Sequence, residues 1–172
     1  VDIKQRDWPN SSLNKCPIWC SVDLRDGNQA LAEPMDSARK MKFFKKLIEV
    51  GYKEIEVGFP SASDTDFNFI RELINDGHIP DDVTIQVLTQ SREELIIKTI
   101  DSLKGSKNAI IHLYNSTSTL QRKVVFKEDM NGVKKIATDG AKIISDNIGI
   151  LNNTNVRLEY SPESFTGTEL PY

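Results

Sequence analysis

The sequence contains few cysteine and histidine residues. Cys16, Cys20, His78 and His112 are the only cysteines and histidines, and they do not form two pairs with zinc-finger spacing. This argues against a zinc knuckle. We expect both cysteines to pack near the core, which fits a reducing cytoplasm. His78 lies in a Gly- and Pro-containing loop and is expected on the surface.

Long apolar runs and an excess of basic residues are also lacking. No run approaches the roughly 20 apolar residues of a membrane helix, and the first residues form no signal-peptide core. The 22 Lys and Arg residues are scattered and are outnumbered by 25 Asp and Glu residues, giving a net charge of -3. Membrane and nucleic-acid partners are therefore not expected. The chain begins with Val1 rather than Met, so we expect a trimmed chain or part of a longer protein.

The 172 residues suit one ordinary domain in which strands alternate with helices. Apolar runs predict strands over 18–23, 54–59, 83–88, 109–114 and 156–160. Helical spacing predicts helices between them. Pro34 opens the first and Gly51 closes it, Ser63 or Asp64 caps the second, and a capping box over 91–94 opens the third. The pattern predicts an α/β fold with a parallel sheet.

Polar residues cluster where these strands end, which is where parallel sheets bind ligands. They are Arg25, Asp26, Glu56, Ser61, Ser63, Thr89, Gln90, His112, Tyr114, Asn115, Glu159, Ser161 and Glu163. Loop polarity alone explains the Ser, Thr and Asn residues. It explains His112 less well, because the strand before it is apolar.

The segment 22–29 combines an anion-binding residue with a metal ligand. Arg25 can grip a carboxylate through two parallel hydrogen bonds, and Asp26 offers a hard oxygen to a divalent cation. A structural Arg–Asp pair at the end of a strand explains the segment alone equally well, since structural ion pairs are common.

Five motifs, in order, resemble those of the 2-isopropylmalate synthases and span nearly the whole chain. They are DLRDGNQAL at 23–31, EIEVGFPSAS at 54–63, VLTQSR at 87–92, HLYNSTS at 112–118 and EYSPESFTGTE at 159–169. Trp8, Pro9 and Trp19 resemble the longer subfamily found in fungi and some bacteria.

The resemblance implies a part of a metal-dependent (β/α)8 TIM barrel, about five strands of eight over 18–172, preceded by an extension over 1–17. It implies an acyltransferase of leucine biosynthesis that condenses acetyl-CoA with 3-methyl-2-oxobutanoate. Arg25 and Glu163 are the implied catalytic residues. Asp26 is the implied ligand of a divalent ion (Zn, Mn or Mg). The implied substrate-binding residues are Arg25, Gln29, Leu88, His112, Tyr114 and Ser161.

The sequence departs from this family in lacking its His-X-His metal ligands and the last three strands. We therefore expect this chain alone to be inactive. Homocitrate and citramalate synthases are alternatives of the same superfamily. A non-catalytic 2-oxoacid-binding or interaction fragment is another, with an open fifth strand that pairs with a second chain. The resemblance also implies a homodimer for the full-length protein, located in the cytoplasm, or in mitochondria if the source is a fungus.

Overall fold

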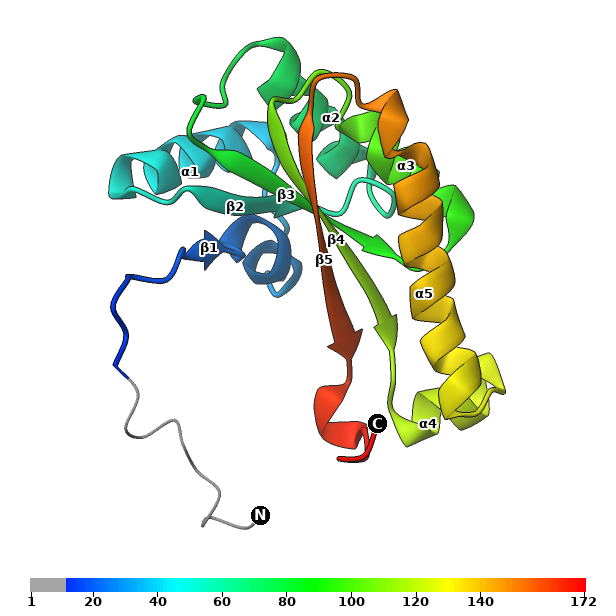
Figure 1. Cartoon of the computed structure of the whole chain (residues 1–172). Coiled ribbons are helices and arrows are strands. Elements are labelled where there is room, and N and C mark those ends of the chain that lie inside the picture. The colour runs from blue at the N-terminus through cyan, green and yellow to red at the C-terminus, as the bar shows by residue number, and fades with distance from the viewer. Residues whose placement is uncertain (1–11) are drawn as a thin grey trace.

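The structure, a computed structural model, describes residues 12–172. Most of the predicted extension over 1–17, with Trp8 and Pro9, lies outside the described residues. Five parallel strands form one curled sheet in the order β1-β2-β3-β4-β5 (Figure 1). They are β1 (Cys20–Ser21), β2 (Glu54–Gly58), β3 (Thr84–Gln90), β4 (Asn108–Ser116) and β5 (Asn155–Glu163). The predicted α/β class and partial barrel are confirmed.

The long helices connect successive strands and lie on the same side of the sheet (Figure 1). They are α1 (Ser37–Val50), α2 (Asp64–Asn75), α3 (Glu93–Ser102) and α5 (Met130–Asn147). Shorter turns are η3 (Asp23–Gly27), α4 (Thr119–Gln121), η4 (Arg122–Phe126), η5 (Ile148–Ile150) and η6 (Phe165–Gly167). Among the described residues, no helix has the length and hydropathy needed to span a bilayer.

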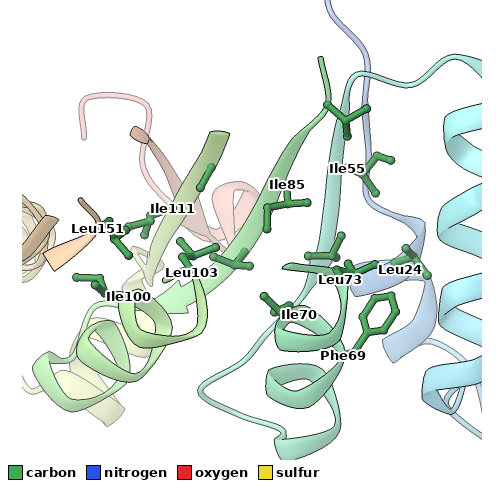
Figure 2. Packing of buried hydrophobic residues seen from close by; sticks show 14 of the residues in the cluster. Leu24, Ile55, Phe69, Ile70, Leu73, Ile85, Ile100, Leu103, Ile111 and Leu151 are labelled. Atoms are coloured by element: carbon green, nitrogen blue, oxygen red, sulfur yellow. The ribbon is translucent and has the colours of Figure 1, made fainter. Parts of the chain in front are cut away.

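Alternation along the strands divides the sheet into an apolar face and a polar face. Ile55, Ile85 and Ile111 belong to the hydrophobic core between the sheet and the helices, together with Phe69 and Ile100 from the helices (Figure 2). Because successive strand residues point to opposite faces, the polar residues between the apolar ones share the other face. This concave face carries the candidate site.

The first strand is shorter than predicted. Only Cys20 and Ser21 pair with β2, opposite Glu54 and Ile55. Ile18 and Trp19 are 69% and 68% exposed and lie before β1, so the predicted strand over 18–23 is wrong for these two residues. The reason is that β1 is an edge: within residues 12–172 it has a neighbour on one side only, and apolar character alone does not make a strand.

The two cysteines differ in their surroundings. Both are free, but Cys16 is exposed while Cys20 is half-buried. The prediction of packing near the core therefore holds for Cys20 and is wrong for Cys16.

Two predicted helix starts are also wrong. Helix α1 begins at Ser37 rather than at Pro34, because the Asp36 side chain accepts a hydrogen bond from the Arg39 amide. The predicted capping box does not form, since the Ser91 hydroxyl donates to the Ile136 carbonyl instead. The Ser63 cap of α2 and the Gly51 end of α1 are confirmed; Gly51 has a φ of 109°, which suits glycine.

A buried ion pair joins α1 and α2 to the end of β2. Lys40, with a side chain 1% exposed, pairs with Asp66 and lies 5.6 Å above the Phe69 ring. The second carboxylate oxygen of Asp66 accepts a 2.8 Å hydrogen bond from the Phe59 amide. A Cβ on Gly58 would lie 2.9 Å from the Asp66 carboxylate, so this approach requires glycine. Two helices thus fix the backbone at Phe59.

Replacing Asp66 should destabilise the chain strongly. Asp66→Asn leaves the Lys40 ammonium buried without a counter-charge, a loss of about 3 kcal/mol in the free energy of unfolding. Urea unfolding measures it. The control is Asp64→Asn on the same helix, because the Asp64–Lys98 pair is exposed and should contribute little. Equal effects of the two variants would contradict the role of the buried pair.

Candidate active site

A cavity of about 330 Å³ opens at the carboxyl ends of the strands. Its walls come from η3, the start of the loop after β2, and strands β3, β4 and β5. The lining residues are Arg25, Asp26, Gln29, Phe59, Leu88, His112, Tyr114, Ser161 and Glu163. The structure therefore brings together all eight residues that the sequence predicted for the site and adds Phe59.

The turn η3 presents Arg25 to this cavity. The backbone amides of Arg25, Asp26 and Gly27 all approach the Val22 carbonyl, at 3.2, 2.8 and 3.3 Å. Leu24 is fully buried, which contributes about 2 kcal/mol toward holding the turn against the sheet. The Arg25 side chain, 15% exposed, is thereby directed across the sheet to Glu56.

Glu56 is a fully buried carboxylate that three side chains satisfy. Arg25 Nε donates to Oε1, while Gln86 Nε2 and His112 Nδ1 lie 2.6 Å from Oε2. Burial raises the pKa of Glu56, but hydrogen bonds from His112 and Gln86 and the charge of Arg25 outweigh it. The net pKa therefore lies below its ordinary value of 4.5. Glu56 is ionised at neutral pH.

Cys20 lies on the far side of the Gln86 amide from Glu56. Its thiol lies 3.7 Å from Gln86 Oε1. Burial, followed by the negative charge of Glu56, raises the pKa of Cys20 to about 12, so the sulfur keeps its proton and donates. The ionised Glu56 carboxylate can only accept, so the Gln86 NH2 group faces it and the Gln86 oxygen faces the thiol. Cys20 is thus a structural donor rather than a nucleophile.

His112 connects the buried carboxylate to the cavity. One ring nitrogen, Nδ1, contacts Glu56, while Nε2 lies 2.5 Å from the Ser161 hydroxyl. Glu159 approaches the same Nε2 at 3.6 Å. A buried side chain of β2 is therefore linked, through His112 on β4, to a hydroxyl of β5 that lines the cavity.

One wall of the cavity is aromatic and apolar. Phe59 and Tyr114 meet edge to face, with ring centroids 6.1 Å apart, and Leu88 lies beside them in the lining. Burial, followed by the negative charge of Glu163, raises the pKa of Tyr114, so its hydroxyl stays protonated at neutral pH. The site thus combines an apolar wall with a cationic and hydroxyl-bearing wall.

Asp26 is the predicted metal ligand, and its side chain is 66% exposed. Its Oδ1 accepts a 2.8 Å hydrogen bond from Arg25 Nη1. No group of three His, Cys, Asp or Glu side chains within residues 12–172 lies close enough to hold a metal. The described residues therefore do not complete a metal centre around Asp26, and the role of Asp26 stays a prediction.

The sequence assigned no role to Glu56, Gln86 and Phe59. Glu56 and Gln86 lie within their strands, each between apolar neighbours. A polar side chain in such a position needs a buried partner, so it signals a polar contact inside the sheet. Other polar residues near the strand ends do not line the cavity. They are Ser61, Ser63, Thr89, Gln90, Asn115 and Glu159.

A larger hollow of about 920 Å³ lies at the opposite ends of the strands. Trp19, Tyr52 and Arg157 are among its lining residues, and none of the predicted site residues is. Its charged lining is neutralised in pairs, Lys53 with Asp82 and Arg157 with Glu54. All of the predicted site residues line the smaller cavity instead.

The family model described as HMGL-like matches residues 16–172. The whole chain is 60% identical to a protein named 2-isopropylmalate synthase from Renibacterium salmoninarum, 62% to one from Parafrankia sp. and 56% to one from Pseudomonas savastanoi. The chain spans only 30%, 31% and 31% of these three proteins.

The stability of the chain should depend on pH through Glu56. Because its folded-state pKa lies below 4.5, the ionised carboxylate stabilises the fold above that pH. This stabilisation is lost as pH falls through the folded-state pKa. Glu56→Gln should lower the free energy of unfolding at neutral pH and flatten its decline in acid. Urea unfolding between about pH 6 and pH 3 measures both.

The matched control is Glu49→Gln on the exposed face of α1, where Glu49 pairs with Lys46. This variant should keep the pH dependence of the parent chain. A Glu56→Gln chain that keeps the parent's full acid decline would contradict the assignment.

Proposed function

The chain belongs to the HMGL-like family, and from this premise we propose that it forms part of an acyltransferase that makes 2-isopropylmalate. The proposed reaction condenses acetyl-CoA with 3-methyl-2-oxobutanoate in the first committed step of leucine biosynthesis. One observation carries the proposal: all eight predicted residues converge on one cavity, where Arg25 is locked to a buried carboxylate.

Arg25 is proposed to bind the oxygens of the 2-oxoacid. Its Nε is occupied by Glu56, while Nη1 is shared between Asp26 at 2.8 Å and Gln29 at 3.5 Å. Nη2 makes no hydrogen bond within the described part of the chain. The guanidinium thus keeps donors for the keto oxygen, whose negative charge grows as the carbon–carbon bond forms. Because Glu56 holds Arg25 in advance, little reorganisation is needed.

The lining supports a monocarboxylate with an apolar side chain. Among the described residues that line the cavity, Arg25 is the only Lys or Arg. The 2-oxoglutarate expected for a homocitrate synthase carries a second carboxylate that these residues would leave unpaired. Leu88 and Phe59 offer apolar contact to the isopropyl group, which pyruvate, the substrate of a citramalate synthase, lacks.

A divalent ion and acetyl-CoA are proposed as cofactor and co-substrate. When bound, such an ion polarises the keto group as a Lewis acid. Asp26 is its proposed ligand in this chain. Since the described residues do not complete the metal site, we propose that its remaining ligands, and a homodimer contact, lie on the rest of a longer protein. Within this chain we propose 18–172 as the barrel part and 1–17 as an extension.

Two further proposals stand beside this one. Glu163 is proposed as the second catalytic residue, since it lines the cavity and influences Tyr114. A 2-oxoacid-binding fragment without activity is the alternative of another class, favoured by β5, which within residues 12–172 pairs with a strand on one side only. The relatives named above are bacterial, which gives the mitochondrial alternative no support.

Steady-state kinetics of the complete gene product test the reaction. With acetyl-CoA, we expect kcat/KM for 3-methyl-2-oxobutanoate to exceed that for pyruvate and 2-oxoglutarate by at least about 100-fold, because an unpaired buried charge or a missing branch costs that much. A preference for either competitor would overturn the substrate assignment. A reading frame that ends at Tyr172, with no turnover, would favour the non-catalytic alternative.

Arg25→Lys should lower kcat/KM of the complete enzyme by about 100-fold, because the charge remains while the planar fork is lost. Kinetics with saturating acetyl-CoA measure this. The control is Arg39→Lys, an exposed position on α1 that should leave kcat/KM unchanged. Near-normal activity of Arg25→Lys would show that the fork is not used.

A further inference from the structure

The backbone of Glu163 is held by the neighbouring strand. Glu163 ends β5 opposite Ser116, the last residue of β4. The amide of the next residue, Thr117, donates a 3.1 Å hydrogen bond to the Glu163 carbonyl. The Glu163 carboxylate lines the cavity, and within residues 12–172 no hydrogen bond or ion pair holds it. The position of this carboxylate therefore depends on its backbone and on the turn that follows it.

The turn after Glu163 begins with a strained residue. Ser164 has a φ of 60° and a ψ of 45°, in the left-handed region that favours glycine. A residue with a side chain stays there only when surrounding contacts hold it. The Ser164 carbonyl accepts two hydrogen bonds, from the Gly167 amide at 3.0 Å and from the Thr168 hydroxyl at 3.1 Å. Losing them lets the peptide between Glu163 and Ser164 rotate, which moves the Glu163 side chain.

The Thr117 hydroxyl ties this turn to the end of β4. Thr117 is fully buried, and its Oγ1 lies 2.7 Å from Thr168 Oγ1. Because Thr168 donates its one hydrogen to the Ser164 carbonyl, Thr117 is the donor to Thr168. The Thr117 Oγ1 also lies 3.4 Å from the Glu163 carbonyl, which is a longer contact. Thr117 thus holds Glu163 through its amide and the following turn through its hydroxyl.

Further contacts hold the segment after β5 against the loop after β4, and Figure 1 shows the two side by side. The Arg122 side chain, 9% exposed, pairs with Glu169, and its guanidinium lies 5.6 Å from the centre of the Tyr172 ring. A Cβ on Gly167 would lie 3.0 Å from the Ser118 Cβ, so the two backbones approach closely there. These contacts bring the two threonine hydroxyls within hydrogen-bonding distance.

We propose that the hydroxyl pair of Thr117 and Thr168 positions Glu163 for the condensation, by fixing the turn that directs its carboxylate into the cavity. Neither threonine is among the residues that line the cavity, so both act through Glu163. They are positioning residues rather than catalytic ones. This inference rests on the proposed function, because it takes Glu163 to be a catalytic residue of the acyltransferase.

The position of Glu163 matters more for turnover than for binding. A carboxylate that assists a proton transfer must lie within hydrogen-bond reach of the reacting group, about 2.6–3.2 Å, so a small displacement lowers the rate. The 2-oxoacid itself is proposed to be held by Arg25, on the opposite side of the sheet from the threonine pair. Loss of the pair is therefore expected to lower kcat and to leave KM for the 2-oxoacid nearly unchanged.

Steady-state kinetics of the complete gene product with saturating acetyl-CoA test this role. Thr117→Val replaces the hydroxyl with a methyl group of similar size and keeps the amide. We expect kcat to fall about tenfold, with KM for 3-methyl-2-oxobutanoate within about twofold of the parent value. Thr168→Val should act in the same way. Thr117→Ser keeps the hydroxyl and should retain kcat within about threefold.

A double-mutant cycle with Glu163→Gln separates positioning from a merely structural role. Glu163→Gln alone should lower kcat by at least about 100-fold. If Thr117 acts through Glu163, adding Thr117→Val to Glu163→Gln should change kcat by less than about twofold. A threonine that only stabilises the fold would lower kcat by the same factor in both backgrounds.

The matched control is Thr119→Val, the same substitution two residues further along the loop. Thr119 is exposed at the start of α4, and its hydroxyl makes no hydrogen bond within residues 12–172. This variant should leave kcat and KM unchanged. Urea unfolding shows which variants are folded, and Thr168→Val replaces Thr117→Val in the cycle if the latter does not fold.

The possible failures can be told apart. An unchanged kcat in folded Thr117→Val and Thr168→Val variants overturns the positioning role and leaves the proposed reaction intact. A tenfold loss that persists in the Glu163→Gln background does the same. Near-normal kcat of Glu163→Gln contradicts the catalytic role of Glu163 and, with it, the positioning role. Absence of turnover by the parent protein overturns the proposed reaction and this inference together.

Discussion

The buried carboxylate of Glu56 is the group on which the rest of the site depends. Removing an ion from water is costly unless charge and hydrogen bonds replace the lost hydration. Arg25, Gln86 and His112 provide that replacement from three different parts of the chain. Because each must reach the same two oxygens, Glu56 fixes their relative positions. The guanidinium and the imidazole that face the cavity are therefore held in place before any ligand arrives.

This polar cluster is possible because the sheet has two different faces. On the helix side, Ile55, Ile85 and Ile111 form a core of ordinary hydrophobic packing (Figure 2). On the concave side, Glu56 and Gln86 occupy the alternating positions. The hydrophobic packing of the fold thus lies on the helix side, and the concave side carries the polar cluster around Glu56. The cavity opens at the carboxyl ends of the strands, which is where parallel sheets bind their ligands.

Much of this arrangement could be predicted from the sequence. Strand and helix alternation predicts a parallel sheet, and parallel strands bring Arg25, His112 and Ser161 to one end although they are far apart in the chain. The predictions that were wrong concern residues whose structure depends on contacts with distant parts of the chain. Ile18 and Trp19 are apolar but have no second strand beside them, and Ser91 bonds to a neighbouring helix rather than capping its own. The hydrogen-bonding partners of Glu56 also needed three dimensions, because no spacing rule connects β2 with β3 and β4.

The order of the Glu56 contacts along the chain has a consequence for biosynthesis. Arg25 lies 31 residues before Glu56, whereas Gln86 and His112 lie 30 and 56 residues after it. A ribosome makes the chain from its N-terminus, so the cation exists before the acid that it neutralises. The nascent chain can bury Glu56 with its countercharge already present, and the later strands then add their hydrogen bonds to a neutral pair. In the reverse order, Glu56 would have been synthesised before Arg25, and the growing chain could not have buried it as a neutral pair.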